Sequence, residues 1–200
     1  KNNHTSNLYH DYRWGKIIEE CFGHRCHFLL SESFDGAING VLPLVHMKSW
    51  SFGSFIVSMP FFNYGGVCAD DDSVRDNLIA EAVRIAKDLK VQHIEFRQEK
   101  SLQNEFPEKT VKVSMRLDLP GSPEELWKSF PSKLRSQIKV PQKAGMIARI
   151  GGIDELESFY NVFTDNMRHL GTPVYPIRFF RNILEEFPEL PELSMHLTIQ

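Results

Sequence analysis

Apolar side chains recur at helical spacing along several stretches of the chain. In residues 11–23, for example, Trp14, Ile17 and Ile18 fall on one helical face, and Gly23 supplies a stop signal. Periodicity, capping residues and terminal Gly or Pro extend the same interpretation along the chain. Asp70 to Asp72, with Ser73, are expected to cap the helix that follows them. Helices are predicted at residues 11–23, 73–89, 122–130, 132–143, 153–171 and 176–188.

Other stretches alternate apolar with polar residues, which is typical of half-buried β-strands. The dipeptide Asp35-Gly36 favours a tight hairpin turn, so the runs on either side predict a pair of antiparallel strands. Residues 109–120 alternate regularly and predict a further strand of an antiparallel sheet. The chain is therefore expected to be an α/β (α+β) protein, with a mixed, largely antiparallel sheet flanked by helices. Strands are predicted at residues 27–33, 37–48, 53–59, 64–69, 91–97, 109–120, 146–152 and 193–200.

The bulk composition is that of an ordinary globular chain. It has 200 residues, 42% of them hydrophobic, and a formal net charge of -3. This charge disfavours a nucleic-acid coat, a DNA-binding protein or a membrane-surface protein, so anion binding is expected only from a local patch. No apolar run approaches the roughly 20 residues that span a bilayer, so no integral membrane segment is expected and a cytoplasmic location is the default.

The cysteines do not form a disulfide framework. Cys21, Cys26 and Cys68 are an odd set without CxxC spacing, and they are expected to be packing residues in a reducing compartment. The run "CFGHRCH" holds two Cys and two His, but it spans a predicted helix end and strand start. Because no second ligand cluster accompanies it, no metal site is predicted.

Positive charge is concentrated in "FPSKLRSQIKVPQKAG", residues 130–145. If residues 132–143 are helical, Arg135, Lys139 and Lys143 follow one another along one face, and Pro141 is expected to bend or restart the helix. A solvated helix face is one interpretation. A phosphate-bearing ligand such as a diphosphate, a nucleotide or an RNA backbone is the other, because no carboxylate interleaves these cations. Every charged residue between Leu126 and Ile153 is basic: Lys128, Lys133, Arg135, Lys139, Lys143 and Arg149.

The segment and its neighbours also resemble a known family. "FPSKLRSQIKVPQKAGM" follows the run "VSMRLDL" and precedes a helix ending "NMRHLGTPVYPIRFFRNIL". Earlier come "LYHDYRWGKIIEECFGHRCHFLL" and "NGVLPLVHMKSWSFGSFIVSMPFFNYGGVCADD". In this order and over nearly the whole chain, the motifs resemble the FemAB-like acyltransferases, especially the branch associated with exosortase and exopolysaccharide gene clusters.

This resemblance implies two GNAT-like (N-acetyltransferase-like) modules in one polypeptide. Residues 1–145 would form the first module, including the basic helical segment 131–145, and residues 146–200 would begin a second, truncated module. The chain starts at Lys1 without an initiator Met and ends in a predicted strand, so it is expected to be part of a longer protein. Enzymes of this family pass an amino acid from aminoacyl-tRNA to an amine of a cell-wall precursor.

The resemblance also implies site residues. In "PFFNYGG", Asn63, Tyr64, Gly65 and Gly66 would line the acceptor cleft, although the paired glycines equally suit a tight turn or a β-bulge. Candidates for contacts with precursor diphosphate or tRNA are Lys133, Arg135 and Lys139, with Lys143 on the same helix. In "RHLGTPVY" the candidates are Arg168, Gly171, Thr172 and Tyr175, although this run also serves as a helix stop.

Acyl transfer to an amine requires a base, donors to a tetrahedral oxyanion, and positioning. No nucleophile elbow or Ser-His-Asp order is evident, which favours direct attack by the amine. Glu95 and Arg97 are weak catalytic candidates, since an ion pair at a sheet edge explains them equally well. His46, His93 and His169 are expected to be structural.

Three functions remain open from the sequence. The first is a FemAB-type aminoacyl- or acyltransferase of cell-envelope or exopolysaccharide assembly. The second is a CoA-dependent N-acyltransferase, although the glycine-rich loop that holds CoA pyrophosphate is absent from this stretch. The third is a non-catalytic module that binds a phosphorylated glycan or RNA. No resident cofactor is expected, and aminoacyl-tRNA or acyl-CoA would be a co-substrate.

Overall fold

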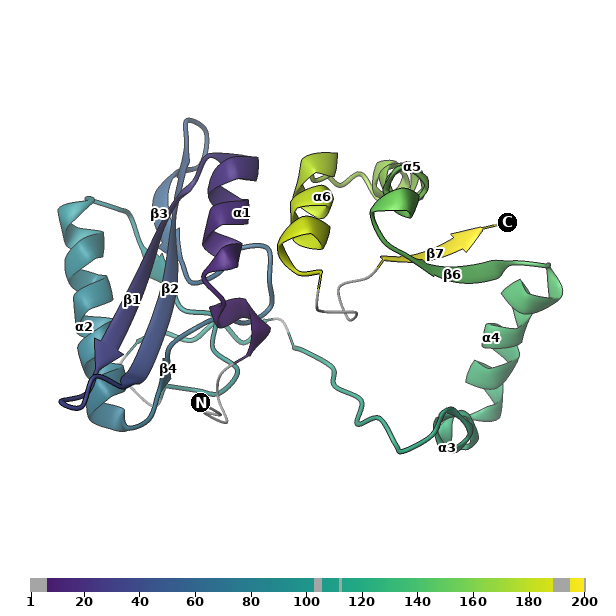
Figure 1. Ribbon diagram of the computed structural model, residues 1–200, viewed down its shortest axis with the longest axis horizontal. Coiled ribbons are helices and arrows are strands. Elements are labelled where there is room, and N and C mark those ends of the chain that lie inside the picture. The colour runs from purple at the N-terminus through teal and green to yellow at the C-terminus, as the bar shows by residue number, and fades with distance from the viewer. Residues whose placement is uncertain (1–6, 103–105, 112, 189–194, 200) are drawn as a thin grey trace. The chain divides into compact units, whose positions relative to one another are not determined.

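The computed structural model of the protein describes residues 7–102, 106–111, 113–188 and 195–199 (Figure 1). By its internal contacts the chain divides into two compact units, Lys1–Lys112 and Val113–Gln200. Each unit is described by itself. The module boundary that the family resemblance places at residue 145 stays a prediction, because a division by packing does not test it.

The first unit contains an open sheet with the strand order β1-β2-β3-β5, and a short strand, β4, pairs with β2. β1 and β2 form the predicted hairpin, in which Leu29 lies opposite Leu42. All pairings are antiparallel except that of β3 with β5, which is parallel. The prediction of a mixed, largely antiparallel sheet is therefore confirmed. The strands are β1 (Arg25–Glu32), β2 (Ile38–Ser49), β3 (Gly53–Val57), β4 (Cys68–Ala69) and β5 (Ile94–Glu95).

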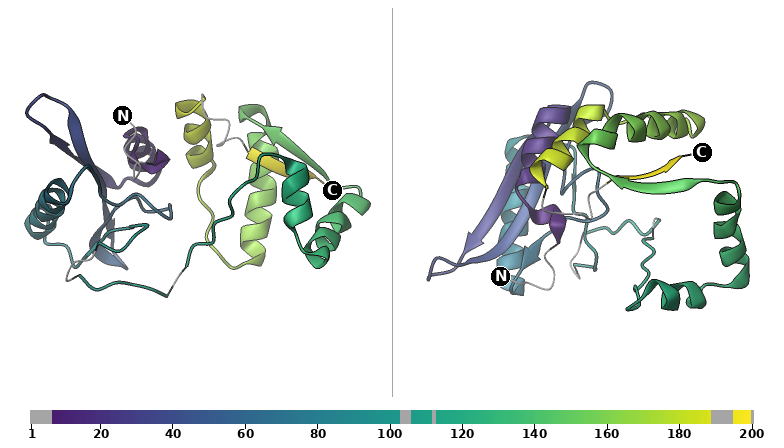
Figure 2. Two further views of the ribbon diagram at one scale, coloured as in Figure 1. Left: turned by 90° about the horizontal axis from the view of Figure 1, so that it is seen from below. Right: turned by 45° about the vertical axis from the view of Figure 1, so that its right-hand side comes forward.

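Two helices, α1 (Arg13–Phe22) and α2 (Asp72–Asp88), cover opposite faces of this sheet (Figure 2). α1 approaches β1 so closely that a Cβ atom on Gly15 would lie 2.6 Å from the Phe28 ring. The helix ends as predicted at Gly23, whose φ of 70° is in the left-handed region. A short 3-10 helix, η1 (Leu8–His10), precedes α1.

The main core of the first unit lies between the sheet and α2. β2 contributes Leu42 and Leu44, which are two residues apart and so face the same side of the sheet. α2 contributes Leu78 and Ala82, one helical turn apart. The helix begins at its predicted acidic cap, where the Asp71 carboxylate accepts a hydrogen bond from the Val74 N–H at 2.8 Å.

The second unit contains helices and a two-stranded antiparallel sheet. α5 and α6 pack through aromatic rings: the Phe180 ring meets those of Phe159 and Phe163 edge-on, with each pair of centroids 5.1 Å apart. The elements are α3 (Pro123–Ser129), α4 (Ser132–Lys143), β6 (Ile147–Gly151), η2 (Ile153–Glu155), α5 (Leu156–His169), α6 (Ile177–Glu186) and β7 (Met195–Ile199). All of these helices and strands were predicted from sequence patterns, with η2 as the first turn of the helix predicted at residues 153–171.

Two expectations need correction. The strand predicted at residues 109–120 is wrong, because residues 109–111 and 113–120 contain no strand. Their apolar side chains, such as Val113 and Met115, are exposed. An alternating pattern becomes a strand only where another strand pairs with its backbone, and no described strand pairs with this stretch. The second correction concerns Pro141. It lies inside one continuous helix, α4, so the alternative that it restarts the helix is wrong, and the expected bend stays a prediction.

Two remaining properties concern the whole described chain. Cys21 and Cys68 are buried, as expected of packing residues, and Cys26 is half-buried. Among the described helices, none combines the length and the apolar character needed to cross a bilayer.

Candidate functional site

The segment after β3, residues 58–67, is held in place by aromatic rings. The Phe62 ring stacks on Tyr9 at a centroid distance of 4.7 Å and meets Trp14 edge-on at 4.6 Å. The preceding Phe61 ring stacks on Phe22 at 4.3 Å. Met59 and Phe61 both have φ in the left-handed region, at 50° and 75°. Such backbone angles are costly for residues with side chains, so the aromatic contacts offset local strain.

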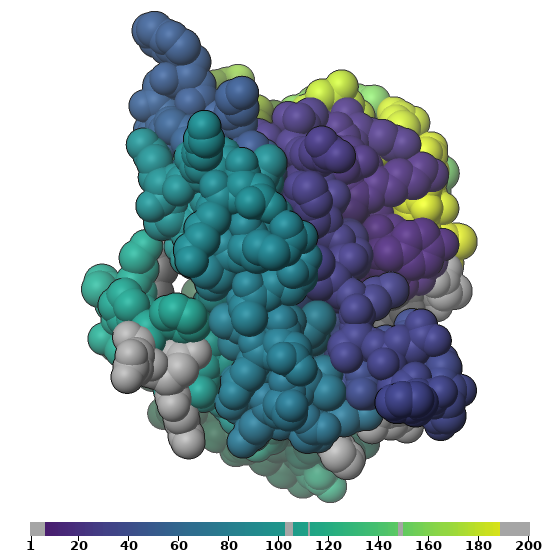
Figure 3. All heavy atoms as spheres, turned by 90° about the vertical axis from the view of Figure 1, so that its left-hand side faces the viewer, coloured from purple at the N-terminus to yellow at the C-terminus, as the bar shows by residue number. Residues whose placement is uncertain are grey.

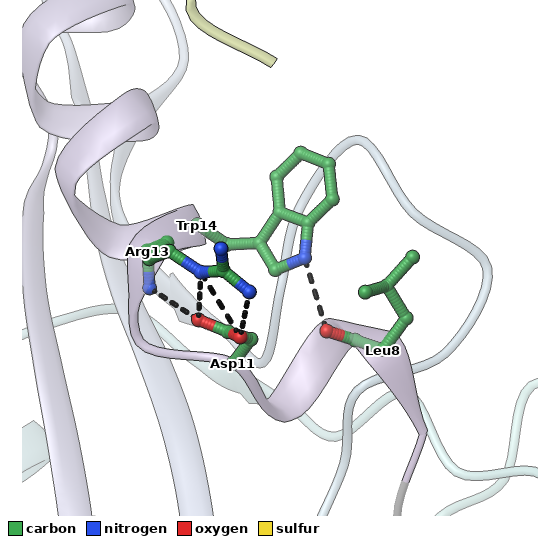
Figure 4. Close-up of polar contacts among 4 residues, drawn as sticks. All are labelled: Leu8, Asp11, Arg13 and Trp14. Atoms are coloured by element: carbon green, nitrogen blue, oxygen red, sulfur yellow. Dashed lines mark hydrogen bonds and ion pairs between the residues drawn. The ribbon is translucent and has the colours of Figure 1, made fainter. Parts of the chain in front are cut away.

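The segment from Leu8 to Trp14, which carries the Tyr9 and Trp14 rings, is fixed by its own hydrogen bonds (Figure 4). The Trp14 indole N–H donates to the Leu8 carbonyl oxygen at 3.0 Å. The Asp11 carboxylate accepts from the Arg13 guanidinium at 2.8 Å and from the Arg13 backbone N–H at 2.9 Å. Partial burial raises the pKa of Asp11, but these contacts outweigh burial and the pKa lies below its ordinary value. This segment is therefore a rigid support for residues 58–67.

Backbone and hydroxyl contacts tie residues 58–67 to the end of β5. Ser58, which is 0% exposed, donates its backbone N–H to the Glu95 carbonyl oxygen at 2.9 Å. Its hydroxyl accepts from the Arg97 N–H at 2.7 Å. The Gly66 N–H in turn donates to the Arg97 carbonyl oxygen at 3.0 Å. Beyond the parallel pairing of β3 and β5, the Ser58 hydroxyl and the Gly66 N–H thus continue the hydrogen bonding to the chain after β5.

The paired glycines are required by the protein's own backbone. A Cβ atom on Gly66 would lie 3.0 Å from the Arg97 carbonyl oxygen and would collide with the Gln98 side chain. Gly65 has a φ of 131°, and a Cβ atom there would lie 2.6 Å from the Met59 side chain. These close approaches support the turn interpretation of the pair. They also bring the backbone of both glycines to the edge of a cavity.

That cavity has a volume of about 320 Å³ and lies in the first unit. Of the residues predicted for the site, Tyr64, Gly65, Gly66 and Arg97 line it, whereas Asn63 and Glu95 do not. His10, Gln98 and the acidic start of α2 also line it and were not predicted as site residues. The run Asp70–Asp72 was interpreted only as a helix cap, although its position just after the glycine pair could have indicated the cavity.

The charges around the cavity are mixed. The acidic residues that line it are Asp70, Asp71, Asp72 and Glu99, and the basic ones are Arg75, Arg97 and Lys100. Arg75 is held by Asp72 and Asp76, the latter at 2.9 Å. A lining that combines both signs does not have the predominantly cationic character of a phosphate-binding surface. It is compatible with a ligand that carries an amine.

Glu95 and Arg97 form an ion pair, with Arg97 Nε 2.9 Å from Glu95 Oε1. Arg97 Nη1 also donates to the Phe62 carbonyl oxygen at 2.6 Å, so the guanidinium joins β5 to residues 58–67. Partial burial raises the pKa of Glu95, but the hydrogen bond and charge of Arg97, with Lys109, hold it below its ordinary value. A carboxylate with a lowered pKa is a weaker base, so the catalytic role of Glu95 stays a prediction that this geometry does not favour.

The basic helix α4 has the predicted conformation and lies in the second unit. Lys133, Lys139 and Lys143 are exposed, whereas Arg135 is half-buried. Lys139 Nζ lies 5.7 Å from the centre of the Trp127 ring, a cation–π distance. Within the described part of the chain, no carboxylate forms an ion pair with any of these four cations. None of them lines the cavity, and their contact with an anion stays a prediction.

The predicted residues after α5 form a helix end. Gly171 has a φ of 63°, and the Thr172 N–H donates to the Met167 carbonyl oxygen at 3.0 Å, which closes the last turn. Arg168 pairs with Asp165 at 3.2 Å. The Tyr175 carbonyl oxygen accepts from the Tyr160 hydroxyl at 3.0 Å. Each of these residues has a structural partner, and a binding role for Arg168, Thr172 and Tyr175 stays a prediction.

Comparison with known proteins agrees with the family resemblance. The model of the FemAB family matches residues 58–197, which is more than half of the chain and includes the glycine pair, Arg97 and α4. The chain belongs to the FemAB family. No match to a curated protein was found.

A solved structure supports the fold of this FemAB chain. The crystal structure of FemX is similar with a TM-score of 0.64 and 19% sequence identity. The similarity covers 98% of this chain and 54% of FemX, so this chain spans about half the length of FemX. At this identity the likeness shows the fold alone. It confirms the predicted α/β class and is consistent with the expected GNAT-like fold.

Proposed function

We propose that the full-length protein is a FemAB-type transferase that passes an acyl group, specifically an amino acid, to an amine of a cell-envelope or exopolysaccharide precursor. The observation that carries the proposal is the family match over residues 58–197, which spans both the glycine pair at the cavity and the basic helix α4. Aminoacyl-tRNA is the proposed donor. Because that donor is cytoplasmic, the reaction is proposed to take place on the cytoplasmic side.

In this reaction the acceptor nitrogen attacks the carbonyl carbon of the aminoacyl ester. A C–N bond forms and the ester C–O bond breaks. The ammonium group loses two of its three protons, one to a base and one to the leaving ribose oxygen, and keeps the third on the amide nitrogen. The cavity is proposed to hold the amine-bearing part of the acceptor. Its mixed lining supports this assignment, since carboxylates such as Asp71 attract an ammonium group, while Arg97 and the two glycines also line the cavity.

The helix α4 is proposed to contact the phosphates of the precursor or of tRNA. Lys133, Arg135, Lys139 and Lys143 have no described carboxylate partner, so an anion would compensate their mutual repulsion. Because exposed charges are screened by salt, binding of the phosphorylated partner should weaken as ionic strength rises. No observation specifically favours the CoA-dependent alternative.

The test uses the full-length protein with radiolabelled aminoacyl-tRNA or labelled acetyl-CoA, each with an amine-bearing lipid-diphosphate precursor. Transfer of label from aminoacyl-tRNA alone supports the proposal, and transfer from acetyl-CoA alone refutes the proposed donor. In parallel, Arg135→Gln should weaken tRNA or precursor binding several-fold, whereas Lys87→Gln, an exposed cation on α2, should not. Equal binding by both variants would refute the role of α4.

A further inference from the structure

The turn between β2 and β3 presents two aromatic side chains to solvent. Trp50 is 103% exposed and Phe52 is 78% exposed. The turn is tight, because Ser49 and Gly53 are paired across the hairpin. In the space-filling view the turn protrudes from the first unit as a steel-blue knob at the upper left (Figure 3). Neither ring makes a ring contact with any residue in the described part of the chain.

The backbone of this turn is well anchored although its rings are not. Lys48 pairs with Ser54 across the two strands, and the Gln92 N–H donates to the Ser54 carbonyl oxygen at 2.9 Å. The His46 Nε2 atom lies 2.8 Å from the Ser54 hydroxyl oxygen. Exposed Trp and Phe rings do not contribute to the stability of the fold, because they remain in water. Two such rings on one fixed turn therefore indicate a contact surface.

Charge is segregated between the two ends of the sheet that carries this turn. The hairpin β2–β3, residues 38–57, contains no Asp or Glu. At the end of the sheet where the turn lies, β1 begins with the exposed Arg25, β2 ends near the exposed Lys48, and Lys90 follows α2. The opposite end has Asp35 in the β1–β2 turn and Asp70–Asp72 before and at the start of α2.

The nearby carboxylates have partners other than Arg25 and Lys48. Asp88 at the end of α2 is paired with Arg84 at 2.7 Å. Glu19 of α1 accepts the Cys26 backbone N–H at 2.8 Å. Within the described residues neither Arg25 nor Lys48 forms an ion pair. The end of the sheet therefore combines a protruding aromatic pair with cations that form no ion pair among the described residues.

We propose that the β2–β3 turn docks on an anionic lipid bilayer, with the rings of Trp50 and Phe52 in the interface and with Lys48 and Arg25 over the headgroups. Tryptophan is enriched at bilayer interfaces, where its ring and its N–H meet apolar and wet surroundings together. Basic side chains beside apolar rings are the typical composition of peripheral membrane contacts. The knob is convex, so it penetrates an interface more readily than it forms a groove for a peptide.

This inference revises an expectation from composition. The net charge of -3 disfavoured a membrane-surface protein. That value is a sum over the whole chain, so it does not show that one end of this sheet is acidic and the other basic. Only the fold shows that Arg25, Lys48 and Lys90 lie at the same end of the sheet as the exposed rings. The inference is independent of the proposed acyl transfer, because it concerns the end of the sheet opposite the cavity-lining run Asp70–Asp72.

The test measures binding of the whole chain to vesicles of phosphatidylglycerol and phosphatidylcholine, compared with pure phosphatidylcholine, by co-sedimentation at low salt. Binding to the anionic vesicles is expected, and the double variant Trp50→Ser/Phe52→Ser should weaken it roughly tenfold or more. Lys48→Gln should weaken it about fivefold. The matched control is Phe34→Ser, because Phe34 is 114% exposed in the β1–β2 turn at the acidic end and should not contribute.

Tryptophan fluorescence then locates the contact. Vesicles containing brominated acyl chains should quench the emission of the wild-type protein and of Phe34→Ser, and should not quench that of Trp50→Ser. The proposal is overturned if the wild-type protein does not sediment with anionic vesicles, or if the double variant binds as tightly as the wild type. It is also overturned if the double variant changes the oligomeric state in the absence of lipid, which would make the turn a contact between copies of the chain.

Discussion

The buried hydroxyl of Ser58 accepts a hydrogen bond of 2.7 Å from the backbone N–H of Arg97, 39 residues further along the chain. Through this contact a side chain continues the parallel pairing of β3 and β5 where the regular ladder ends. Arg97 then holds the Phe62 carbonyl oxygen and, through its own carbonyl oxygen, Gly66. The buried Ser58 side chain thus helps to hold Arg97 and Gly66, which line the cavity, in position.

Replacing Ser58 with alanine should destabilise the chain by about 1–3 kcal/mol, because it removes the buried hydroxyl that accepts from the half-buried Arg97 N–H. Urea denaturation would measure the change in the free energy of unfolding. Ser51→Ala is the matched control, since Ser51 is exposed and its change should be within about 0.5 kcal/mol. An equal effect of the two substitutions would contradict the importance of the Ser58 contact.

Replacing Gly66 with alanine should also destabilise the first unit, by about 1–3 kcal/mol. The new methyl group would press on the Arg97 carbonyl oxygen and would displace the Gln98 side chain from the cavity wall. Thermal unfolding compares this variant with Gly121→Ala, where a Cβ atom would meet no other atom within 4 Å. A Gly66→Ala variant as stable as Gly121→Ala would show that this close approach is not required.

Stability should fall as the pH is lowered from 8 to 5.5. Burial lowers the pKa of His24, His27 and His46 below the ordinary value, and nearby positive charge, such as that of His46 beside His24 or of Lys48 beside His46, lowers it further. As the pH falls through the ordinary value of about 6.5, the unfolded chain therefore takes up protons that the folded chain does not. Because the unfolded state binds more protons, the free energy of unfolding decreases with falling pH.

Urea denaturation at pH 8, 6.5 and 5.5 measures this dependence, and His24→Gln should make it shallower. Glu19 opposes the effect at His27, since its negative charge raises that pKa. The lowered pKa values of Asp11 and Glu95 act in a separate, more acidic window: their stabilisation is present above the ordinary carboxyl pKa of about 4 and is lost below it. A stability that does not change between pH 8 and 5.5 would contradict the histidine assignment.

Cys26 should be unreactive in the folded protein. Burial, with the charge of Glu19 beside it, raises the pKa of the Cys26 thiol to about 12. At pH 8 the thiolate fraction is then far smaller than in an unfolded chain, and the higher nucleophilicity of a basic thiolate offsets only part of that loss. Alkylation by iodoacetamide, followed by mass spectrometry of the Cys26 peptide, should be on the order of a hundredfold slower in the native chain than in urea. Equal rates in both conditions would contradict the raised pKa.

Local sequence patterns predicted the helices and the hairpin well, because the residues that determine each of these elements lie within the element itself or directly beside it. The helix at α1 follows from its periodicity and from Gly23, and the hairpin β1–β2 follows from Asp35-Gly36. Residues 109–120 have an equally regular pattern and form no strand in the described structure. Alternation states which side chains share a face, but a strand also needs a neighbouring backbone, and that information is not local.

The candidate site was predicted only in part for the same reason. The glycine pair at Gly65 and Gly66 is visible as a local motif, and both residues line the cavity. His10 reaches the Gly66 carbonyl oxygen from 56 residues away, at 2.8 Å, and Gln98 reaches the Val67 carbonyl oxygen from 31 residues away. No local pattern identifies such contacts. The positive charge of α4 was equally visible, but a row of cations does not by itself indicate its anion.

The most informative substitution at the candidate site is Arg97→Lys. The guanidinium donates from Nε to Glu95 and from Nη1 to the Phe62 carbonyl oxygen, and a lysine ammonium group cannot reproduce this planar, two-sided geometry. Residues 58–67 should therefore open more often, with amide hydrogen exchange at the Gly66 N–H faster by roughly tenfold. Mass-spectrometric hydrogen exchange measures this without any substrate.

Arg84→Lys is the matched control for that experiment, because Arg84 also contacts two carboxylates, Glu81 at 2.6 Å and Asp88 at 2.7 Å, but on the exposed face of α2. Surface ion pairs contribute little to stability, so exchange in residues 58–67 should remain at the wild-type rate in that variant. In the full-length protein, Arg97→Lys should lower the proposed transfer as well, because the same segment lines the cavity. Unchanged exchange at Gly66 would show that the Arg97 guanidinium does not hold residues 58–67 in place. Faster exchange with an unchanged rate of transfer would show that the contact supports the cavity wall but is not needed for the reaction.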